Sequence, residues 1–183
     1  MIRPTYALLL LLLPLSACSS STEAAPPEVL LVENFNAENG GSYGLNYTGF
    51  ANWDVPVGSV DLVGTAPYDD FLPTTQGLYV DLDGSSMAGG LLRSKTDFEL
   101  EPGTYRLEFK MAGTPRANQA ANTVNVSVGG YFQESITLAS FAPLLVYVRT
   151  FKVRSRGTAH LQFEELGGDN YGNFIDDIRF ERL

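Results

Sequence analysis

Five tyrosines stand in segments rich in Gly, Asn and Asp, where side chains of a folded protein meet solvent. An aromatic ring can stack on the C–H face of a sugar-like ring, and neighbouring Asn, Asp or Arg side chains can hydrogen-bond to its hydroxyl groups. Arg116 could supply such donors. Each tyrosine taken alone is better explained by ordinary packing or surface exposure, and only two or three of them close together in space would make a site. The candidate tyrosines are Tyr43, Tyr47, Tyr68, Tyr131 and Tyr171. The predicted ligand-binding set takes four of them with the arginine: Tyr43, Tyr47, Tyr131, Tyr171 and Arg116.

Asp176 is a carboxylate in an otherwise apolar alternating run, Phe174 to Phe180. Alternation places it on the same face as Ile178 and Phe180, which are expected to point into a core. A buried carboxylate needs a partner, because an unpaired buried charge is costly. One interpretation is that Asp176 accepts hydrogen bonds from backbone N–H groups of a neighbouring turn.

Side chains that could catalyse a reaction are scarce. The chain has one histidine, His160, which alternates with Leu161 and Phe163 and is expected to face outward. No Gly-x-Ser-x-Gly motif is present, so a nucleophile elbow is not indicated. Many acids could form a carboxylate pair for glycoside hydrolysis, but nothing in the sequence singles one pair out. The sequence therefore predicts a protein that is not an enzyme.

The cysteine count and the net charge exclude further classes of site. A single cysteine cannot form an internal disulfide or a Cys-rich zinc or iron–sulfur site, and no redox or organic cofactor is expected. The 183 residues carry a formal net charge of −9. That balance argues against nucleic acid as a partner, because phosphates need a basic surface.

The amino terminus has the pattern of an export signal. Arg3 precedes an apolar run that ends at Leu15 and is too short to cross a bilayer. The next residues, Leu15-Ser16-Ala17-Cys18, resemble the lipobox of bacterial lipoproteins, which implies cleavage before Cys18 and fatty acyl groups such as palmitate on it. An ordinary signal peptide is the alternative. Ser19 resembles the residue found in lipoproteins sorted to an outer membrane or cell surface, so we expect an exported, membrane-anchored lipoprotein.

Beyond this region, the elements that must position the candidate side chains are strands. Residues 1–17 are expected to form the signal peptide and residues 18–28 a lipidated flexible tether. From Val29 onward, period-two alternation recurs, most clearly in the run from Tyr105 to Met111, and turns rich in Gly, Asn, Asp and Pro separate the alternating runs. Trp53 alternates with Val55 and Val57 and is expected in the core. Residues 29–183 are therefore predicted to form one all-β sandwich domain.

An ordered series of short motifs makes this domain resemble a known family. The series includes Asn34-Phe35-Asn36-Ala37-Glu38, Asn52-Trp53-Asp54-Val55, Gly77-Leu78-Tyr79-Val80-Asp81-Leu82-Asp83-Gly84, Leu100-Glu101-Pro102-Gly103-Thr104-Tyr105, Gly167-Gly168-Asp169-Asn170-Tyr171-Gly172 and Ile175-Asp176-Asp177-Ile178. Together they resemble the galactose-binding-like jelly rolls of exported bacterial proteins, many of which end in a Pro-Glu-Pro sorting signal. A plant cell-wall domain of unknown function is similar. The resemblance implies a galactose-binding-like jelly-roll β-sandwich.

The same resemblance suggests one structural calcium ion. Jelly-roll binding modules of this type commonly hold calcium between their first and last strands, using oxygen ligands. It implies Asp176 as a ligand, with Asn36 or Glu38 and loop carbonyls near Gly40. Backbone capping by Asp176, described above, remains the alternative.

These observations favour a non-catalytic, lipid-anchored binding protein of the bacterial envelope, with a polysaccharide or other glycan as its ligand. The alternative is a protein-interaction or structural component of the cell surface or extracellular matrix. Exposed aromatic residues gathered beside Asn, Asp or Arg would favour the first, and an apolar patch or an unpaired sheet edge the second. The oligomeric state does not follow from the sequence.

Overall fold

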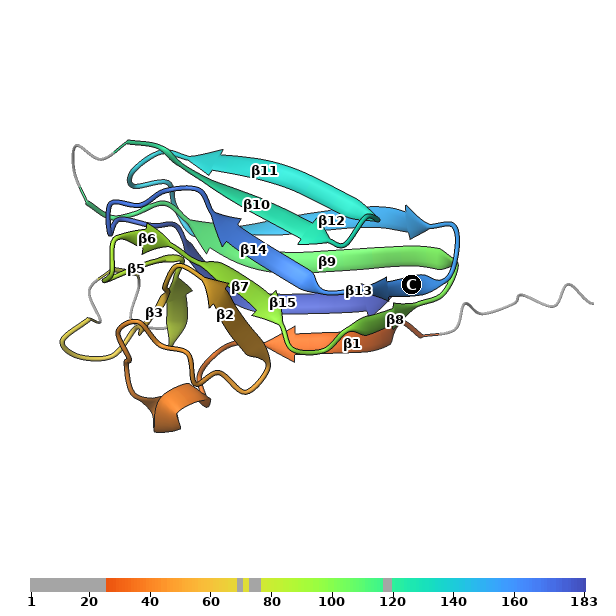
Figure 1. Ribbon diagram of the computed structural model, residues 1–183, viewed down its shortest axis with the longest axis horizontal. Helices are drawn as coiled ribbons and strands as arrows, with labels where there is room; N and C mark the ends of the chain where they lie inside the picture. The colour runs from red at the N-terminus through yellow and green to blue at the C-terminus, as the bar shows by residue number, and fades with distance from the viewer. Residues whose placement is uncertain (1–25, 69–70, 73–76, 117–119) are drawn as a thin grey trace, which may run out of the picture.

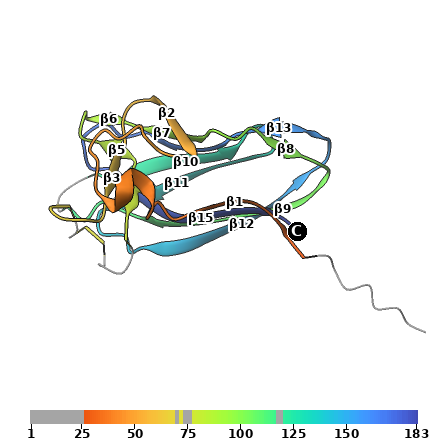
Figure 2. The same cartoon turned by 90° about the horizontal axis from the view of Figure 1, so that it is seen from below.

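Two antiparallel sheets packed face to face make up the domain (Figure 2). The computed structural model describes residues 26–68, 71–72, 77–116 and 120–183. The predicted signal peptide, Cys18 and residues 19–25 of the predicted tether lie outside these residues. The all-β prediction is confirmed, and the two-layered sandwich is a jelly roll.

The first sheet contains the longest strands. Its order is β12-β9-β15-β4-β3, and β1 also pairs with β15. The bounds are β1 Glu28–Glu33, β3 Asp61–Val63, β4 Tyr79–Asp81, β9 Gly103–Ala112, β12 Leu145–Val153 and β15 Phe174–Arg182.

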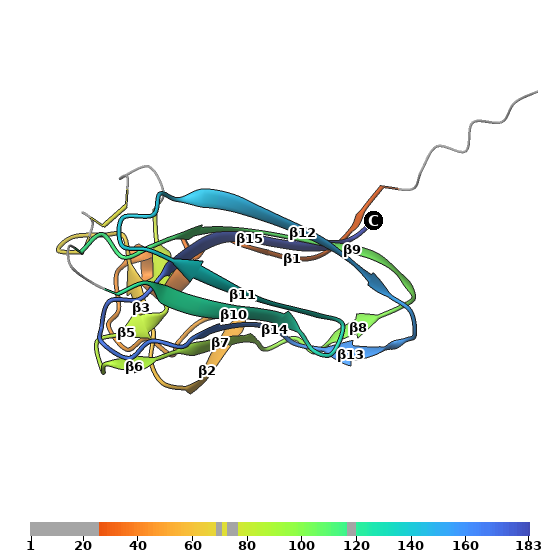
Figure 3. The same ribbon diagram turned by 90° about the horizontal axis from the view of Figure 1, so that it is seen from above.

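The second sheet lies opposite, as Figure 3 shows from above, and has the order β11-β10-β14-β7-β2. Its bounds are β2 Trp53–Val57, β7 Leu91–Ser94, β10 Asn122–Val128, β11 Phe132–Leu138 and β14 Leu161–Glu165. Two short ribbons complete the fold, β8 Phe98–Leu100 with β13 Gly157–Ala159, and β5 Asp83–Gly84 with β6 Ala88–Gly89. One 3-10 turn, η1, covers Glu38–Gly41.

Alternation explains how these strands build the core. In β9, Tyr105, Leu107 and Phe109 are at most 1% exposed, while the residues between them are partly exposed. This confirms the strand predicted from Tyr105 to Met111. Trp53 is fully buried, as predicted, and packs against Phe163 of β14, which is separated from β2 by β7 in the same sheet. Apolar residues of both inner faces form one continuous core.

A second, smaller apolar cluster anchors the loops at one end of the sandwich. Its buried members are Val63, Tyr79, Ala112 and Phe174, on four neighbouring strands of the first sheet. Partly buried residues of the connecting loops pack on it: Tyr68, Phe71, Leu72 and Leu144. This end carries β3, β5 and β6 in Figure 1, and the carboxyl terminus lies at the opposite end.

Strand β15 lies at the centre of the first sheet and has an irregular middle. Its first residues pair with β4 and its last residues pair with β1, so two different strands share one of its edges. The pairing with β9 shifts register between Asp176 and Arg179, and Asp177 has a φ of 46°. Such a bulge turns side chains out of the simple alternation.

Within the described residues, no helix is long and apolar enough to cross a membrane.

Candidate functional site

The loop end of the sandwich bears a small polar pocket, which we call the rim pocket. Its volume is about 150 Å³, and it is lined by Asp61, Val63, Tyr68, Phe71, Asp81, Ser85, Arg116 and Asn170. Strands β3 and β4 supply the two carboxylates, and four loops supply the other polar and aromatic residues. Two strands and four loops therefore meet at this pocket.

Aromatic rings form a row beside the rim pocket. The rings of Tyr43 and Tyr68 lie edge to face with centroids 5.1 Å apart, and those of Tyr68 and Phe71 are 6.4 Å apart. The guanidinium carbon of Arg116 then lies 5.4 Å from the Phe71 ring centroid and 4.9 Å from that of Tyr171. Arg116 thus links Phe71 to Tyr171 through two cation–π contacts and extends the row to Tyr171. We call these five residues the aromatic row.

Asp61 is a fixed acceptor on the floor of the rim pocket. Its side chain is 5% exposed. The Asn46 N–H donates to its Oδ1 at 2.6 Å and the Ser85 N–H at 3.1 Å, while the Ser85 hydroxyl donates to its Oδ2 at 2.6 Å. Three donors satisfy the carboxylate and hold the loops that carry Asn46 and Ser85 in place.

Asp81 differs from Asp61 although both line the rim pocket. Burial raises the pKa of the Asp81 carboxyl well above its ordinary value, and the charges of Asp61, Asp83 and Glu165 raise it further. The Asp83 N–H donates to Asp81 Oδ1 at 3.1 Å, and this hydrogen bond lowers the pKa of Asp81 in part. The rim pocket therefore holds one carboxylate with three donors and one carboxyl that favours its protonated form.

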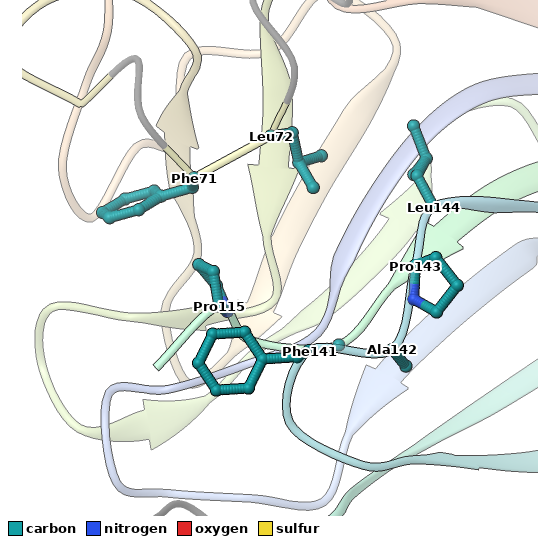
Figure 4. A pocket seen from close by; sticks show the side chains of 8 residues that line it. Phe71, Leu72, Pro115, Phe141, Ala142, Pro143 and Leu144 are labelled. Carbon is teal, nitrogen blue, oxygen red and sulfur yellow. The ribbon is translucent and has the colours of Figure 1, made fainter. Parts of the chain in front are cut away.

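An apolar pocket of about 420 Å³ adjoins the rim pocket and shares Phe71 with it. In Figure 4, Phe71 and Leu72 lie on one side of the apolar pocket and the segment from Phe141 to Leu144 lies on the other. Phe141 is 61% exposed. An apolar surface therefore lies immediately beside the polar one.

Three of the five predicted ligand-binding residues come together in the aromatic row: Tyr43, Tyr171 and Arg116. The other two lie elsewhere. Tyr47 packs edge to face on the buried Phe50, with ring centroids 4.7 Å apart. Tyr131 lies in the turn between β10 and β11, and its hydroxyl packs directly over Gly157. Both are partly buried against the main core.

Each of the three residues predicted to bind calcium accepts a backbone hydrogen bond through one side-chain oxygen. The Leu78 N–H donates to Asn36 Oδ1 at 2.7 Å, and the Ala51 N–H donates to Glu38 Oε1 at 2.8 Å. Asp176 Oδ1 accepts a hydrogen bond from the N–H of the next residue in β15, Asp177, at 2.7 Å. Asp176 Oδ2 is buried without a hydrogen-bond partner.

Burial raises the pKa of Asp176 to about 7. The negative charges of Asp177 and Glu33 act in the same direction, and Lys110 lowers the pKa only in part. Across the residues with described positions, no group of three or more His, Cys, Asp and Glu side chains is arranged to hold a metal ion. Calcium at Asp176 stays a prediction.

His160 is half-buried, and its Nδ1 lies 2.8 Å from the carbonyl oxygen of Ser94 and 3.2 Å from that of Thr96. Two backbone acceptors at one ring nitrogen place the proton there and fix the ring. The side chain thus ties β14 to the end of β7.

Four members of the site were not predicted from the sequence: Phe71, Asp61, Asp81 and Asn170. A signal for the two carboxylates was present, because each stands in a run that is otherwise apolar, Val60 to Val63 and Leu78 to Leu82. A carboxylate in a fully buried strand has to meet donors or a cation, so such positions indicate a polar site. Phe71 and Asn170 carry no comparable signal.

Comparison with known proteins bears on the fold. No protein-family profile matches the chain, and no curated protein sequence matches it. Among solved structures, the enzymatically active domain of tailspike protein 4 from bacteriophage CBA120 matches with a TM-score of 0.50 at 10% identity. That match covers 75% of this chain and 20% of the tailspike chain, so the chain corresponds to about a fifth of that protein.

Two carbohydrate-binding domains match at lower TM-scores. One is the C-terminal CBM6 of LamC from Zobellia galactanivorans, with a TM-score of 0.43, 11% identity, and coverage of 83% of this chain and 98% of that one. The other is the CBM22-1 xylan-binding domain of Xyn10C from Paenibacillus barcinonensis, with a TM-score of 0.46, 12% identity, and coverage of 88% and 98%.

Proposed function

We propose that this chain is a non-catalytic carbohydrate-binding protein of the bacterial envelope, held at the membrane by lipid on Cys18. The observation that carries the proposal is the aromatic row beside the rim pocket. It brings four aromatic rings and one guanidinium together with two carboxylates and the side chain of Asn170. Stacking surfaces next to fixed hydrogen-bonding groups are what a sugar ring needs.

The size of the rim pocket suggests how a glycan would bind. Its 150 Å³ is below the roughly 300–1,000 Å³ of sites that enclose a whole drug-sized ligand. A single sugar residue would therefore enter the rim pocket, with its hydroxyl groups donating to Asp61 and accepting from Arg116. The following residues of the glycan would lie across Tyr68 and Tyr43.

A depletion assay tests this proposal. Purified full-length protein in detergent is incubated with a panel of soluble and insoluble polysaccharides, and the unbound protein is measured. Saturable binding to one class is expected. Tyr68→Ala and Tyr171→Ala should each weaken it about tenfold, the loss expected for a central aromatic contact. Tyr131→Ala, at the other end of the β10–β11 hairpin, is the matched control and should bind as tightly as the unmodified protein.

The proposal fails if no polysaccharide binds, or if Tyr131→Ala weakens binding as much as the two variants in the aromatic row. Circular dichroism melting of each variant separates loss of binding from loss of folding.

A protein-interaction role is the second candidate, and a different surface favours it. Strand β12 is an edge of the first sheet, and three of its apolar residues are exposed: Leu145 by 53%, Val146 by 54% and Val148 by 44%. Together with Phe141 they extend the apolar pocket along an edge whose backbone could pair with another strand. Val146→Lys should abolish such a contact and leave polysaccharide binding unchanged.

A further inference from the structure

Below the rim pocket lies a group of buried oxygen-bearing side chains, which we call the acid cluster. Its members are Asp81 of β4, Asp83 of β5, Glu165 at the end of β14 and Asn173 just before β15. They are 8%, 0%, 3% and 0% exposed, respectively. The acid cluster thus lies between the two sheets, where elements of both meet.

Hydrogen bonds hold one oxygen of each carboxyl group in place. The N–H groups of Asp169 and Asn170 donate to Asp83 Oδ2 at 2.8 and 3.1 Å. The backbone N–H and the side-chain amide of Asn173 both donate to Glu165 Oε2 at 3.1 Å. The loop between β14 and β15 is therefore folded around the carboxylates, and their orientation is fixed before any ligand binds.

Three oxygens of the acid cluster remain without a hydrogen-bond donor in the described structure. They are Asp83 Oδ1, Glu165 Oε1 and Asn173 Oδ1, and all three are inaccessible to solvent. Buried polar atoms in folded proteins are nearly always satisfied, and each exception calls for an explanation. Asn173 is the clearest indication of a ligand. Its side-chain amide donates to Glu165, yet its neutral Oδ1 accepts no hydrogen bond in the described structure.

The charge of the acid cluster is also uncompensated. Among the described residues, no Lys, Arg or His forms an ion pair with Asp81, Asp83 or Glu165. Asp83 and Glu165 both lie close enough to Asp81 to act on its carboxyl group electrostatically. Such a group of acids needs protons or a cation.

The loop backbone leaves little room between itself and the carboxyl groups. A Cβ at Gly172 would lie 2.4 Å from Asp81 Oδ1 and 2.4 Å from the Asp83 nitrogen, and one at Gly167 would lie 3.4 Å from Asp83 Oδ2. Glycine at both positions brings the chain directly against the carboxylates. Such a confined place leaves no room for an organic ligand.

We propose that the acid cluster binds one calcium ion, with Asp83 Oδ1, Glu165 Oε1 and Asn173 Oδ1 as side-chain ligands. Calcium takes carboxylate and amide oxygens and tolerates irregular geometry, which suits two acids and one asparagine better than the octahedral demand of magnesium. The amide ligand makes this a mixed site rather than a group of three acids. It is separate from the calcium predicted at Asp176, and it does not depend on glycan binding.

Calorimetric titration with calcium chloride tests the proposal on the purified full-length protein, after treatment with a chelator. The number of calcium ions bound is compared among the unmodified protein, Glu165→Gln and Asp176→Asn. Both variants replace a buried acid by its amide, so they are matched in size and burial. Glu165→Gln is expected to bind one calcium ion fewer than the unmodified protein, and the loss should be the same in an Asp176→Asn background.

Thermal melting with calcium and with chelator gives a second readout. Calcium should raise the melting temperature of the unmodified protein by several degrees, because an ion that binds only the folded state stabilises it. Should Glu165→Gln not fold, Asp83→Asn replaces it in both measurements. The proposal is overturned if the unmodified protein binds no calcium, or if both cluster variants bind as many ions as it does.

Discussion

Arg116 contacts two aromatic rings at once, so its planar guanidinium matters as well as its charge. Arg116→Lys keeps the charge but replaces a flat group that covers both Phe71 and Tyr171 by a compact ammonium. We expect this variant to bind polysaccharide about fivefold more weakly, the equivalent of roughly 1 kcal/mol. Isothermal titration should show the weaker affinity, with an unchanged melting temperature because Arg116 is exposed. Equal affinity would remove Arg116 from the glycan site.

Asp176 makes stability depend on pH. Its carboxyl has a pKa of about 7 in the folded protein and an ordinary value of 3.8, so the folded state holds its proton more tightly. Folded protein binds more protons between these two values, and the free energy of unfolding therefore falls as pH rises from 4 to 7. In chelator, Asp176→Asn should reduce the loss of stability between pH 5 and pH 8 by on the order of 1–3 kcal/mol. Urea unfolding at pH 5 and pH 8 measures the free energy of unfolding. If Asp176→Asn loses as much stability between these pH values as the unmodified protein, the raised pKa does not belong to Asp176.

At the scale of residues, the sequence predicted which kinds of side chain form the candidate site better than it predicted where each of them lies. Asp176 is buried, but the prediction that alternation places it on the face of Ile178 and Phe180 is wrong. It pairs with Lys110 of β9, which faces away from the core, and the register shift that follows Asp176 separates it from the other two residues. That Tyr47 packs on Phe50 could not be predicted, because a loop tyrosine has no pattern that distinguishes a stacking surface from a packing contact. Only the neighbours that a tyrosine meets in the folded protein show whether its ring is a stacking surface or a packing contact.

Gly58 shows how the loop elements constrain single positions. It follows β2 with a φ of 62°, and a Cβ there would lie 1.9 Å from the carbonyl oxygen of Gly89 in β6. Gly58→Ala should lower stability by about 1–3 kcal/mol, since it combines a left-handed conformation with a backbone clash. For a domain of this size the melting temperature would fall by about 3–10 °C.

Gly130→Ala is the control for that measurement. A Cβ at Gly130 meets no atom within 4 Å, and its φ is not in the left-handed region. Its stability should stay within about 0.5 kcal/mol of the unmodified protein. If both variants melt at the same temperature, the close approach of the β2–β3 connection to β6 does not make Gly58 necessary for the stability of the fold.

At the scale of elements, long regular strands were predictable and interrupted ones were not. The run from Tyr105 to Met111 forms the predicted part of β9 because every second residue enters the core. Strand β15 departs from alternation, since both Ile175 and Asp176 are buried at the register shift. The bulge arises where β4 gives way to β1 along one edge, which depends on pairing between distant segments.

For the whole molecule, the sequence predicts attachment through Cys18. Replacing this residue, Cys18→Ser, removes the one thiol in the chain. We expect the variant to lose incorporation of labelled palmitate and to leave the membrane fraction of an expressing bacterium, while its melting temperature stays the same. A variant that remains in the membrane fraction would refute the lipoprotein prediction.

The fold class was predictable for the whole molecule, but the composition of the candidate site was not. Alternation alone indicates a sandwich, whatever the order of its strands. The rim pocket joins Asp61, Arg116 and Asn170, which lie far apart in the sequence and meet only after the strands cross between the two sheets. Contacts between residues so far apart in the sequence depend on the order of the strands, and no local sequence pattern predicts them.

The pairing of β1 with β15 has a mechanical consequence. Glu28 lies opposite Arg182 and Glu33 opposite Ile178, so β1 starts at the carboxyl-terminal end of the sandwich and runs toward the rim pocket (Figure 1). A pull between a membrane anchor before β1 and a glycan at the rim would act along both strands. Their hydrogen bonds lie across that direction and would be loaded together in shear, instead of opening one after another. Held in this way, the domain would resist flow with its longest axis aligned to the force.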